Sequence, residues 1–237
     1  MDSGDCWLSI IIPTLDEAQG IVRLLQTMQP WREQGVELII VDGGSTDNTL
    51  ALAKSLTDLA MVSEAGRALQ MNAGAARARG RVLWFVHADS FLEGEEIHIL
   101  RACLPKLQSG GWGRFDIRLS GNDWRLRMVA AMMNLRSRIT AIATGDQGIF
   151  ISRGWFDRVG GFPVQPLMED VEISARLRRL GRPVCLRQTI ATDSRRWQRD
   201  GVWRTIVLMW WLRWRYFRGA SAAELHRYYY AAEPSDD

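Results

Sequence analysis

Apolar runs and helical segments alternate four times within the first ninety residues of this chain, and this alternation constrains the fold more than any other feature. The first apolar run is β-branched and ends at a proline, as a buried parallel strand does. The four runs cover residues 8–13, 36–41, 59–63 and 82–86, and helical spacing is found at 17–29, 45–56 and 67–79. We therefore predict an α/β fold with a mostly parallel, Rossmann-like sheet flanked by helices on both faces.

Acidic side chains stand at two strand ends and at the start of a later helix. Asp42 follows the second strand directly, Asp89 follows the fourth, and Glu169 and Asp170 open a helix at 169–180. Ligands of open α/β sheets bind outside the carboxyl ends of the strands, where Asp42 and Asp89 are expected to lie. Three acidic ends in one α/β pattern indicate a site for a phosphorylated, metal-bound ligand.

Past residue 89 the alternation gives way to a mixed pattern. It predicts a helix at 95–107, a half-exposed strand at 111–119, a helix at 123–139 and a short strand at 148–151. The sequence holds no internal repeat or Pro/Ser-rich linker that would divide it. We predict a catalytic domain over residues 1–195, with a nucleotide-binding half at about 1–90 and an acceptor half at about 91–195. A helical extension at 196–237 is expected to pack on it.

Composition excludes several classes of protein. A chain of 237 residues, 47% of them hydrophobic, can bury a large core, and a net charge of +3 is too small to argue for a nucleic-acid partner. Three cysteines without metal-type spacing favour neither a disulfide framework nor a zinc site, and they indicate a reducing compartment. Acids at positions 2 and 5 are untypical of a signal peptide. A cytoplasmic location is expected, with peripheral contact to the inner face of the cell membrane left open.

The residue type at position 89 suits a divalent cation. Mn²⁺ and Mg²⁺ sites often use one or two carboxylates together with substrate phosphates, so Asp89 at a strand end can suffice. His87 lies two residues earlier, on the same face if the strand continues, and could add an imidazole ligand. The alternative is structural: Asp89 caps the next helix through Ser90, and His87 packs internally.

The turn after the second strand allows two interpretations. Asp42 precedes Gly43 and Gly44, whose backbone freedom lets a ligand approach closely, and its carboxylate could accept a hydrogen bond from a base or ribose. The alternative is a plain turn with Asp47 at the start of the next helix. Neither a G-x-G-x-x-G nor a P-loop motif occurs here, so the dinucleotide and P-loop fingerprints are both absent from this turn.

Glu169 and Asp170 are adjacent, so on a helix they point about 100° apart and cannot share one task. One can face the cleft while the other caps the helix or pairs with a cation. A carboxylate at a helix N-terminus is favoured by the helix dipole, which suits a general base that takes a proton from an acceptor hydroxyl. The alternative is that Glu169, Asp170 and Glu172 only decorate the first turn.

Together these segments resemble the family 2 glycosyltransferases of the GT-A fold. Residues 9–17 (SIIIPTLDE) resemble the family's opening strand and turn, and residues 41–47 (VDGGSTD) resemble its V-D-D/G-G-S-x-D element. Residues 66–89 follow its G…N-x-G…A-x-G…D-x-D segment, and residues 169–170 its E-D element, so the likeness is ordered over about 7–182. Residues 87–89, 144–150 and 166–172 also resemble a bacterial subgroup, the selenodomain-associated transferase 2 proteins.

The resemblance implies a role for each matching position. Asp42 would contact the base, Arg67 or Asn72 the ribose or phosphates, Asp89 the metal, and Asp170 would act as base. Asp146, with its neighbours at 145 and 147, would help to form the acceptor side. The residues expected around the bound donor are Pro13, Asp16, Glu17, Asp42, Arg67, Asn72, Ala88, Asp89, Asp146, Glu169, Arg195 and Arg196. The chain departs from the family at His87, where an acid usually begins the D-x-D motif, and this puts the identity of the metal in question.

A helix rich in tryptophan and arginine is predicted at 201–219. It places Trp203, Ile206, Val207, Trp210, Trp214 and Phe217 along one side. A membrane span is excluded, because about 20 apolar residues are required and the uninterrupted run covers only 206–212. The helix either packs on the catalytic domain or a second subunit, which we favour, or lies in the bilayer interface. Arg195 and Arg196, before it, could close over a diphosphate or form a solvated basic turn.

The resemblance implies a metal-dependent inverting glycosyltransferase of the hexosyltransferase type. It would move a sugar from a UDP- or GDP-linked donor to an unidentified acceptor hydroxyl, with Mn²⁺ or Mg²⁺ as cofactor. The acceptor pocket is expected in variable loops at about 112–138. Two alternatives remain: a sugar nucleotidyltransferase, which would be expected to carry a Gly-rich basic loop after the first strand, and a catalytically silent nucleotide-sugar-binding protein.

Overall fold

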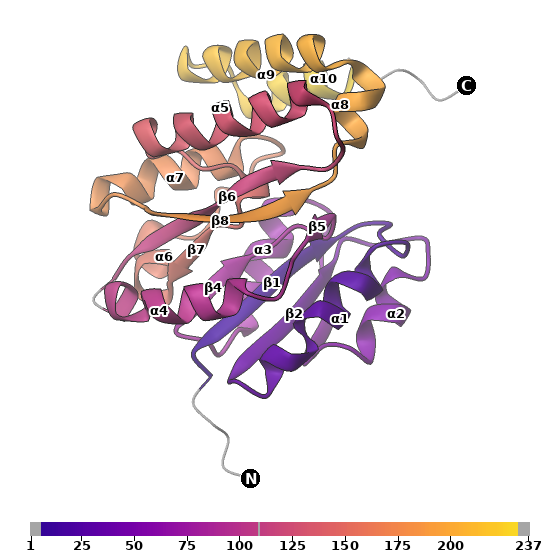
Figure 1. Cartoon of the computed structure of the whole chain (residues 1–237), viewed down its shortest axis with the longest axis vertical. Helices are drawn as coiled ribbons and strands as arrows, with labels where there is room; N and C mark the ends of the chain where they lie inside the picture. The colour runs from indigo at the N-terminus through magenta and orange to yellow at the C-terminus, as the bar shows by residue number, and fades with distance from the viewer. Residues whose placement is uncertain (1–5, 109, 232–237) are drawn as a thin grey trace.

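A computed structural model describes residues 6–108 and 110–231 of the chain and contains one curled eight-stranded sheet (Figure 1). Its order is β3-β2-β1-β4-β7-β6-β8-β5. The first four strands are parallel: β1 pairs with β2 and β4, and β2 pairs with β3. Their bounds are β1 Leu8–Thr14, β2 Val36–Asp42, β3 Leu59–Val62 and β4 Val82–Phe85. The predicted parallel half of the sheet is therefore confirmed.

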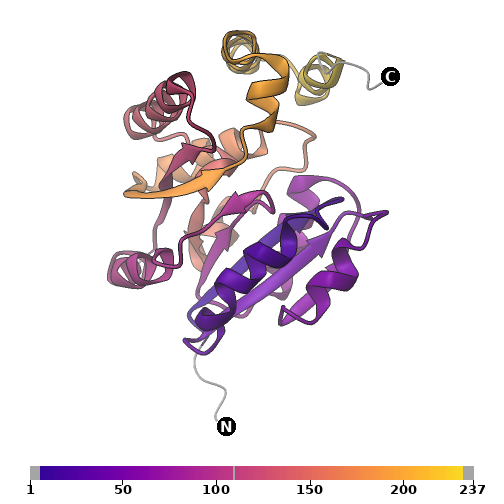
Figure 2. The same ribbon diagram turned by 45° about the vertical axis from the view of Figure 1, so that its right-hand side comes forward.

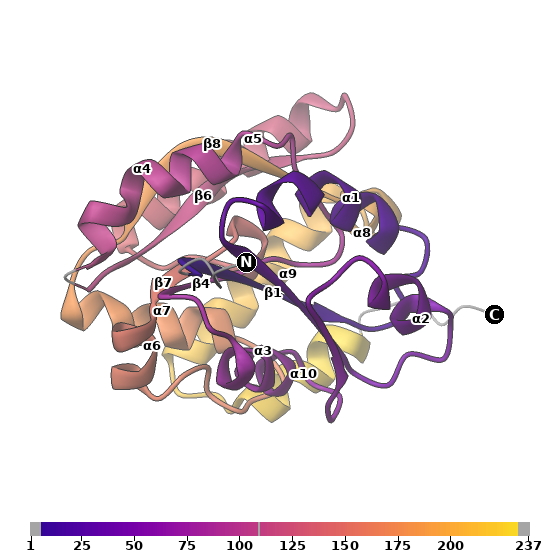
Figure 3. The same cartoon turned by 90° about the horizontal axis from the view of Figure 1, so that it is seen from below.

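Helices cover both faces of this half. Side chains alternate along β1, so Ile10 and Ile12 join one core cluster with α1 and α4, while Ile11 joins another with α3 and α6. Figure 3 shows α1 and α4 on one side of the strands and α3 and α6 on the other. The helices are α1 Ile21–Arg32, α2 Thr49–Lys54, α3 Arg67–Arg77, α4 Glu96–Gln108 and α6 Arg153–Val159. Burial on both faces explains why β1 and β2 are apolar almost throughout.

The second half of the sheet is mixed. β7 pairs antiparallel with both β4 and β6, β6 pairs parallel with β8, and β5 pairs antiparallel with β8. The strands are β5 Ser90–Phe91, β6 Trp112–Leu119, β7 Phe150–Ser152 and β8 Val184–Thr192. The remaining helices are α5 Trp124–Thr140, the short 3₁₀ helix Gly145–Gln147, α7 Glu169–Leu180, α8 Arg195–Asp200, α9 Val202–Phe217 and α10 Ala222–Ala231. The pattern did not predict β5, β8, α6, α8, α10 or the 3₁₀ helix.

A short connection ties the two halves together. Residues 86–89 link the central strand β4 to β5 at the far edge of the sheet, and a turn within them closes with a hydrogen bond from Ser90 N to His87 O, 3.1 Å. Four strand spacings in a flat sheet would measure about 19 Å. Five residue steps reach at most about 18 Å when fully extended, and this turn shortens them. The sheet therefore curls so that β5 returns close to the end of β4.

The C-terminal helices gather at one end of the molecule with α5, away from α1 and α2 (Figure 2). Val202 and Ile206 of α9 share a core cluster with α5 and β6, and Leu212 shares another with Val171 of α7. The opposite side of α9 is exposed, and Ile206 belongs to the buried side, not to the tryptophan side on which the sequence pattern placed it. Among the described residues, no helix has the length and apolar character needed to span a membrane. The division into a domain at 1–195 and an extension stays a prediction.

Gly74 of α3 packs directly on the sheet, and alanine at this position is expected to destabilise the fold by about 1–2 kcal/mol. A Cβ there would lie 2.6 Å from Ile11 Cγ2 and 2.9 Å from Val41 Cγ2. Both neighbours are stiff, β-branched side chains, so the clash outweighs the higher helix propensity of alanine. The matched control is Gly154→Ala in α6, where a Cβ would meet no atom within 4 Å. Urea unfolding measures both variants; equal stability of the two would contradict the packing argument.

Candidate active site

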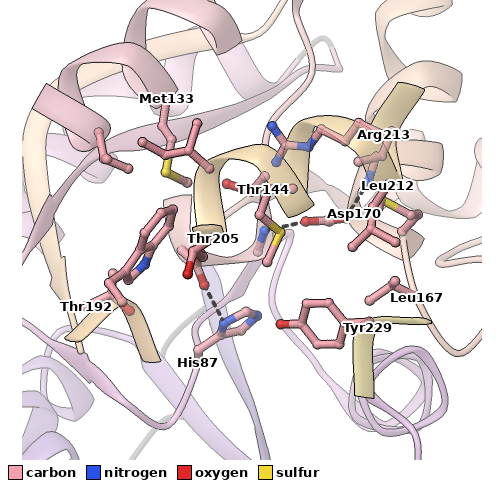
Figure 4. A pocket seen from close by; sticks show the side chains of 18 of the residues that line it. His87, Met133, Thr144, Leu167, Asp170, Thr192, Thr205, Leu212, Arg213 and Tyr229 are labelled. Atoms are coloured by element: carbon pink, nitrogen blue, oxygen red, sulfur yellow. Dashed lines mark hydrogen bonds and ion pairs between the residues drawn. The ribbon is translucent and has the colours of Figure 1, made fainter. Parts of the chain in front are cut away.

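A cavity of about 710 Å³ opens where α5, α7 and α9 meet the ends of β4 and β8. Asp89, after β4, and Asp170, in the first turn of α7, line this same cavity although 81 positions separate them in the sequence. Figure 4 shows Asp170 and Arg213 reaching into this space from one side and Met133 from another. The polar side chains of the lining are Arg67, His87, Asp89, Arg136, Thr144, Asp146, Glu169, Asp170, Thr192, Asp193, Thr205, Arg213 and Tyr229.

The start of α7 fixes the orientation of Asp170. Met168, the N-cap, has φ 67°, a left-handed conformation that is uncommon outside glycine and often found at functional sites. Asp170 Oδ2 accepts a hydrogen bond from Gly145 N, 2.9 Å, and Oδ1 accepts one from Val171 N, 2.7 Å. Each oxygen keeps a second lone pair. The carboxylate is thus held rigidly and can still accept a proton from a ligand.

Glu169 takes a different role from its neighbour. It is 3% exposed, and Oε1 lies 3.4 Å from Arg67 Nη1. Burial raises the pKa of Glu169, and Asp170 adds to this, while Arg67 lowers it. The surrounding protein lowers the pKa of Arg67. The charges of Glu169, Asp146 and Asp170 outweigh this effect, so the pKa of Arg67 is raised. Since 53% of the Arg67 side chain is exposed, its guanidinium remains accessible to an anionic ligand.

A second cavity of about 430 Å³ adjoins the first, and Asp89 and Asp193 line both. Its wall includes Asp16, Glu17 and Ala88, which the sequence placed beside the donor. Burial raises the pKa of Glu17, and the charge of Asp89 adds to this. Burial also raises the pKa of Asp89, an effect that His87 opposes. The lining holds five carboxylates against two guanidinium groups, those of Arg23 and Arg195, and this excess of negative charge favours a bound cation.

The donor set around Asp89 fits a divalent cation that substrate oxygens help to hold. Among residues 6–108 and 110–231, the Asp89 carboxylate forms no ion pair with a basic side chain, and no group of three or more His, Cys, Asp or Glu side chains could hold a metal alone. Mg²⁺ and Mn²⁺ commonly complete such a site with phosphate oxygens. The next helix, α4, begins only at Glu96, so Asp89 is not its cap.

Neighbouring residues surround His87 closely in this structure. Its Nδ1 lies 3.2 Å from Asp146 Oδ1, and Nε2 is buried without a hydrogen-bond partner. A Cβ on Gly145 would lie 2.4 Å from Nε2, so this nitrogen faces backbone. The role of His87 as a metal ligand stays a prediction. The pair with His87 lowers the pKa of Asp146 against the effect of burial.

Asp42 and Asp16 organise the loops around β1 and β2. Asp42 is 2% exposed, and its Oδ2 accepts hydrogen bonds from Gly44 N, 3.0 Å, and Ser45 N, 2.8 Å. It lines neither cavity, so its carboxylate serves the turn in this structure. Asp16, with φ 53°, accepts from Thr46 N, 2.8 Å, and so joins the two loops. Pro13 lies within β1 and lines neither cavity.

Asn72 lies away from both cavities, and its alanine variant is expected to lose about 2–4 kcal/mol of stability without losing nucleotide affinity. Its Nδ2 donates to Phe162 O, 2.8 Å, and its Oδ1 accepts from Phe162 N, 2.9 Å, so both sides of the amide are used. Alanine leaves two backbone groups of a buried residue unpaired. Thermal unfolding and nucleotide titration measure the two effects, with the exposed Asn122→Ala as control. A large loss of nucleotide affinity with unchanged stability would restore the predicted ribose contact.

The end of β8 contributes residues that the sequence pattern did not identify. Asp193 lines both cavities, and its Oδ2 lies 2.6 Å from Arg195 Nε. Arg195 lines the second cavity, and its contact with a diphosphate stays a prediction, whereas the side chain of Arg196 lies outside the described part of the structure. The signal for Asp193 was an acid after an apolar strand end, which becomes visible only once β8 is recognised.

Comparison with known proteins gives a consistent result. The family model described as "Glycosyl transferase family 2" matches residues 9–142. An uncharacterised glycosyltransferase of Mycobacterium tuberculosis is 25% identical over 191 residues, which are 76% of this chain and 72% of that protein. The solved structures, which are less similar in sequence, show the fold alone.

Two solved structures share the fold at low sequence identity. TarS 1–349 of S. aureus, in complex with UDP-GlcNAc, aligns with a TM-score of 0.62 at 19% identity, over 80% of this chain and 59% of that one. The mannosyltransferase PcManGT from Pyrobaculum calidifontis, in complex with GDP-Man and Mn²⁺, aligns with a TM-score of 0.62 at 19% identity, over 78% and 56%. The chain spans only 36% of a longer TarS chain.

Proposed function

Because this chain belongs to glycosyl transferase family 2, we propose that it transfers a sugar, with inversion, from a UDP- or GDP-linked donor to an acceptor hydroxyl. The reaction is of the hexosyl-transfer type and uses Mn²⁺ or Mg²⁺. The observation that carries the proposal is one cavity lined by both Asp89 and Asp170, with a second cavity sharing Asp89. One site thus offers a carboxylate for the diphosphate side and another for the acceptor side.

The donor side of the proposal rests on charge. Asp89 would hold the cation, which when bound neutralises the charge of the departing diphosphate. Arg67, accessible in the cavity, and Arg195, in the second cavity, are placed to contact phosphate oxygens, since guanidinium groups bind them bidentately. Asp16 and Glu17 border the nucleotide. The ligands named for TarS and PcManGT, UDP-GlcNAc and GDP-Man with Mn²⁺, support this choice of donors and metal.

Asp170 acts on the acceptor side as general base. In an inverting displacement the acceptor oxygen attacks the anomeric carbon opposite the leaving diphosphate, so the base and the cation-binding carboxylate must lie on different sides of one space. Asp170, held by Gly145 N and Val171 N, projects from α7, and Asp89 follows β4. The acceptor loses its proton to Asp170 as the new bond forms. The lining from α5 forms the acceptor wall.

A thermal-shift panel tests the proposal. UDP, GDP and their sugars are added with Mn²⁺, with Mg²⁺ or with EDTA. Either the uridine or the guanosine nucleotides are expected to raise the Tm by several degrees, about 2–4 °C for each kcal/mol of binding free energy. The shift is expected only with the metal present. No shift with any nucleotide would contradict the proposal. A metal-dependent shift without donor turnover in the presence of any acceptor would instead support a catalytically silent binding protein.

Two finer assignments accompany this proposal. Residues 87–89, 144–150 and 166–172 support membership of the selenodomain-associated transferase 2 subgroup. The three cysteines, free in the structure, support a reducing, cytoplasmic compartment.

A further inference from the structure

The part of the large cavity that lies between α5 and α9 is apolar. Its walls carry Val129, Met132 and Met133 from α5, and Ile206, Met209 and Trp210 from α9. Sugars and nucleotides bind largely through hydrogen bonds, and apart from the indole N–H of Trp210 and the weakly accepting methionine sulfurs these side chains offer none. Flexible methionine side chains beside aliphatic and indole surfaces are instead suited to a hydrocarbon of variable shape. A volume of about 710 Å³ is ample for a ligand that extends beyond the transferred sugar.

Two arginines stand in this apolar surrounding without an anionic partner. Arg136 of α5 and Arg213 of α9 both line the cavity, and Nε and Nη2 of Arg136 are buried with no hydrogen-bond partner. No described carboxylate lies within ion-pair distance of either guanidinium. Burial lowers the pKa of Arg136 to about 9, and the charge of Arg213 lowers it further. Burial likewise lowers the pKa of Arg213, against the effect of Asp170 and Asp146.

Partly buried cations of this kind, with Nε and Nη2 of Arg136 fully enclosed, are costly unless a ligand completes them. Asp170 offers partial compensation, since its charge opposes the effect of burial on both arginines. However, within the described residues neither guanidinium forms an ion pair or hydrogen bond with the Asp170 carboxylate, whose partners are the backbone N–H groups of Gly145 and Val171. The side chain of Arg213 extends into the cavity, as Figure 4 shows. A bound anion between the two guanidinium groups would provide what the described residues do not.

We infer that this chamber binds the acceptor as an anionic amphiphile, with a phosphate or carboxylate between Arg136 and Arg213 and a hydrocarbon body against α5 and α9. The inference rests on the proposed function and names the acceptor class for it. The acceptor hydroxyl then lies beside Asp170, close to the anionic group. Charge-assisted hydrogen bonds from the two arginines hold the anionic group of the ligand, and the apolar walls select for its hydrocarbon body.

The outer side of the same helices has matching chemistry. Trp203, Val207, Trp214 and Phe217 form one exposed stripe on α9, each 56% exposed or more. Trp210 continues this stripe and also lines the cavity, so the chamber opens beside it.

On α5, Met132 is both exposed and part of the lining, and Leu135 and Ile139 are exposed nearby along the same helix. The exposed arginines around these helices are Arg127, Arg204, Arg218 and Arg227. Exposed tryptophan with arginine is the composition that binds an anionic bilayer surface. The amphiphile therefore reaches the chamber from a membrane, through the opening between α5 and α9.

A soluble binding assay tests the chamber without a membrane. Dodecyl phosphate, dodecyl maltoside and inorganic phosphate are titrated calorimetrically, each amphiphile below its micellar concentration. Dodecyl phosphate is expected to bind at least tenfold more tightly than either of the other two. Arg136→Gln should weaken dodecyl phosphate at least tenfold, while the exposed Arg204→Gln leaves it unchanged. Equal binding of dodecyl phosphate by wild type and Arg136→Gln, or equal binding of inorganic phosphate, would overturn the inference.

Folding of the variants is checked independently. Removal of an unpaired buried cation is expected to keep or raise the Tm of Arg136→Gln, and Arg213→Gln serves as a second variant with the same expected loss of dodecyl phosphate binding. UDP and GDP are titrated into the same proteins. Dodecyl phosphate binding without nucleotide binding would sink the proposed function but not the amphiphile site. Nucleotide binding without dodecyl phosphate binding would do the reverse.

Vesicles identify the source of the ligand. In a co-sedimentation assay, vesicles of phosphatidylcholine with phosphatidylglycerol should bind the wild-type chain at least tenfold more tightly than vesicles of pure phosphatidylcholine do. Trp203→Ser with Trp214→Ser, which do not line the cavity, should remove this retention and leave dodecyl phosphate affinity unchanged. If the wild type is instead a dimer that this double variant dissociates, a second copy covers the stripe and the membrane source is overturned.

Discussion

Asp170→Asn is expected to lower kcat for sugar transfer by about 10²- to 10⁴-fold, the usual contribution of a positioned general base. Asparagine has nearly the same shape, and its amide oxygen can still accept the hydrogen bond from Gly145 N. It loses the hydrogen bond from Val171 N and cannot take a proton from the acceptor. The donor affinity should stay within about twofold, since Asp89 and Arg67 are untouched. Steady-state rates with saturating donor and metal measure the loss.

Glu172→Gln is the matched control for this experiment. Glu172 belongs to the same first turn of α7, does not line the cavity, and pairs with Arg176, Oε1 to Nε 3.0 Å. Its variant should retain nearly full activity. If Asp170→Asn kept a wild-type kcat, Asp170 would be removed from the role of base.

Asp89→Asn is expected to weaken metal-dependent nucleotide binding by at least about 100-fold. Even residues that only support a metal ligand are worth about 10–100-fold in metal affinity, and Asp89 is the proposed ligand itself. Calorimetric titration of UDP or GDP with Mn²⁺ measures the change, and EDTA applied to the wild type should reproduce it. Glu93→Gln, an exposed acid paired with Arg118, is the control. A metal-dependent affinity that survives in Asp89→Asn would contradict the assignment.

The same variant should be more stable than the wild type when no metal is present. Burial raises the pKa of Asp89 above that of an unfolded aspartate, so at neutral pH the ionised carboxylate destabilises the fold, and stability increases as the pH falls through the raised pKa. Asparagine removes this penalty. A higher Tm is expected in EDTA at pH 7, by about 2–4 °C for each kcal/mol of stability gained. A lower Tm under these conditions would show that the charge of Asp89 stabilises the fold.

The fold of the first half could be predicted because strands that are buried on both faces require apolar residues at nearly every position. Strands β1 and β2 are covered on both faces, so their residues are apolar almost without interruption. Strand β8 is different: from Val184 to Thr189 its residues are at most half-buried, and Arg187 and Gln188 interrupt any apolar run. Its pairing with β6 decides its conformation, and that pairing is a property of the tertiary structure.

The candidate site was predictable where position along an element decides it. Asp89 and Asp170 come together because strand ends and helix starts meet at one edge of the sheet. Asn72 could not be assigned in this way, since its partner Phe162 lies 90 positions away. Arg136 and Arg213 left no signal either, because an arginine in an amphipathic helix is ordinarily solvated, and only the packing of α9 over α5 encloses these two.

The four residues between β4 and β5 have a mechanical consequence. They join the parallel half of the sheet to the outer edge of its mixed half, and they include Asp89, which lines both cavities. A rotation of one half against the other must therefore tilt this carboxylate. Binding of a ligand in either cavity is expected to change the ligand affinity of the other cavity by the same factor, because such coupling is reciprocal. The binding of the donor and the binding of the acceptor would then be coupled through residues 86–89.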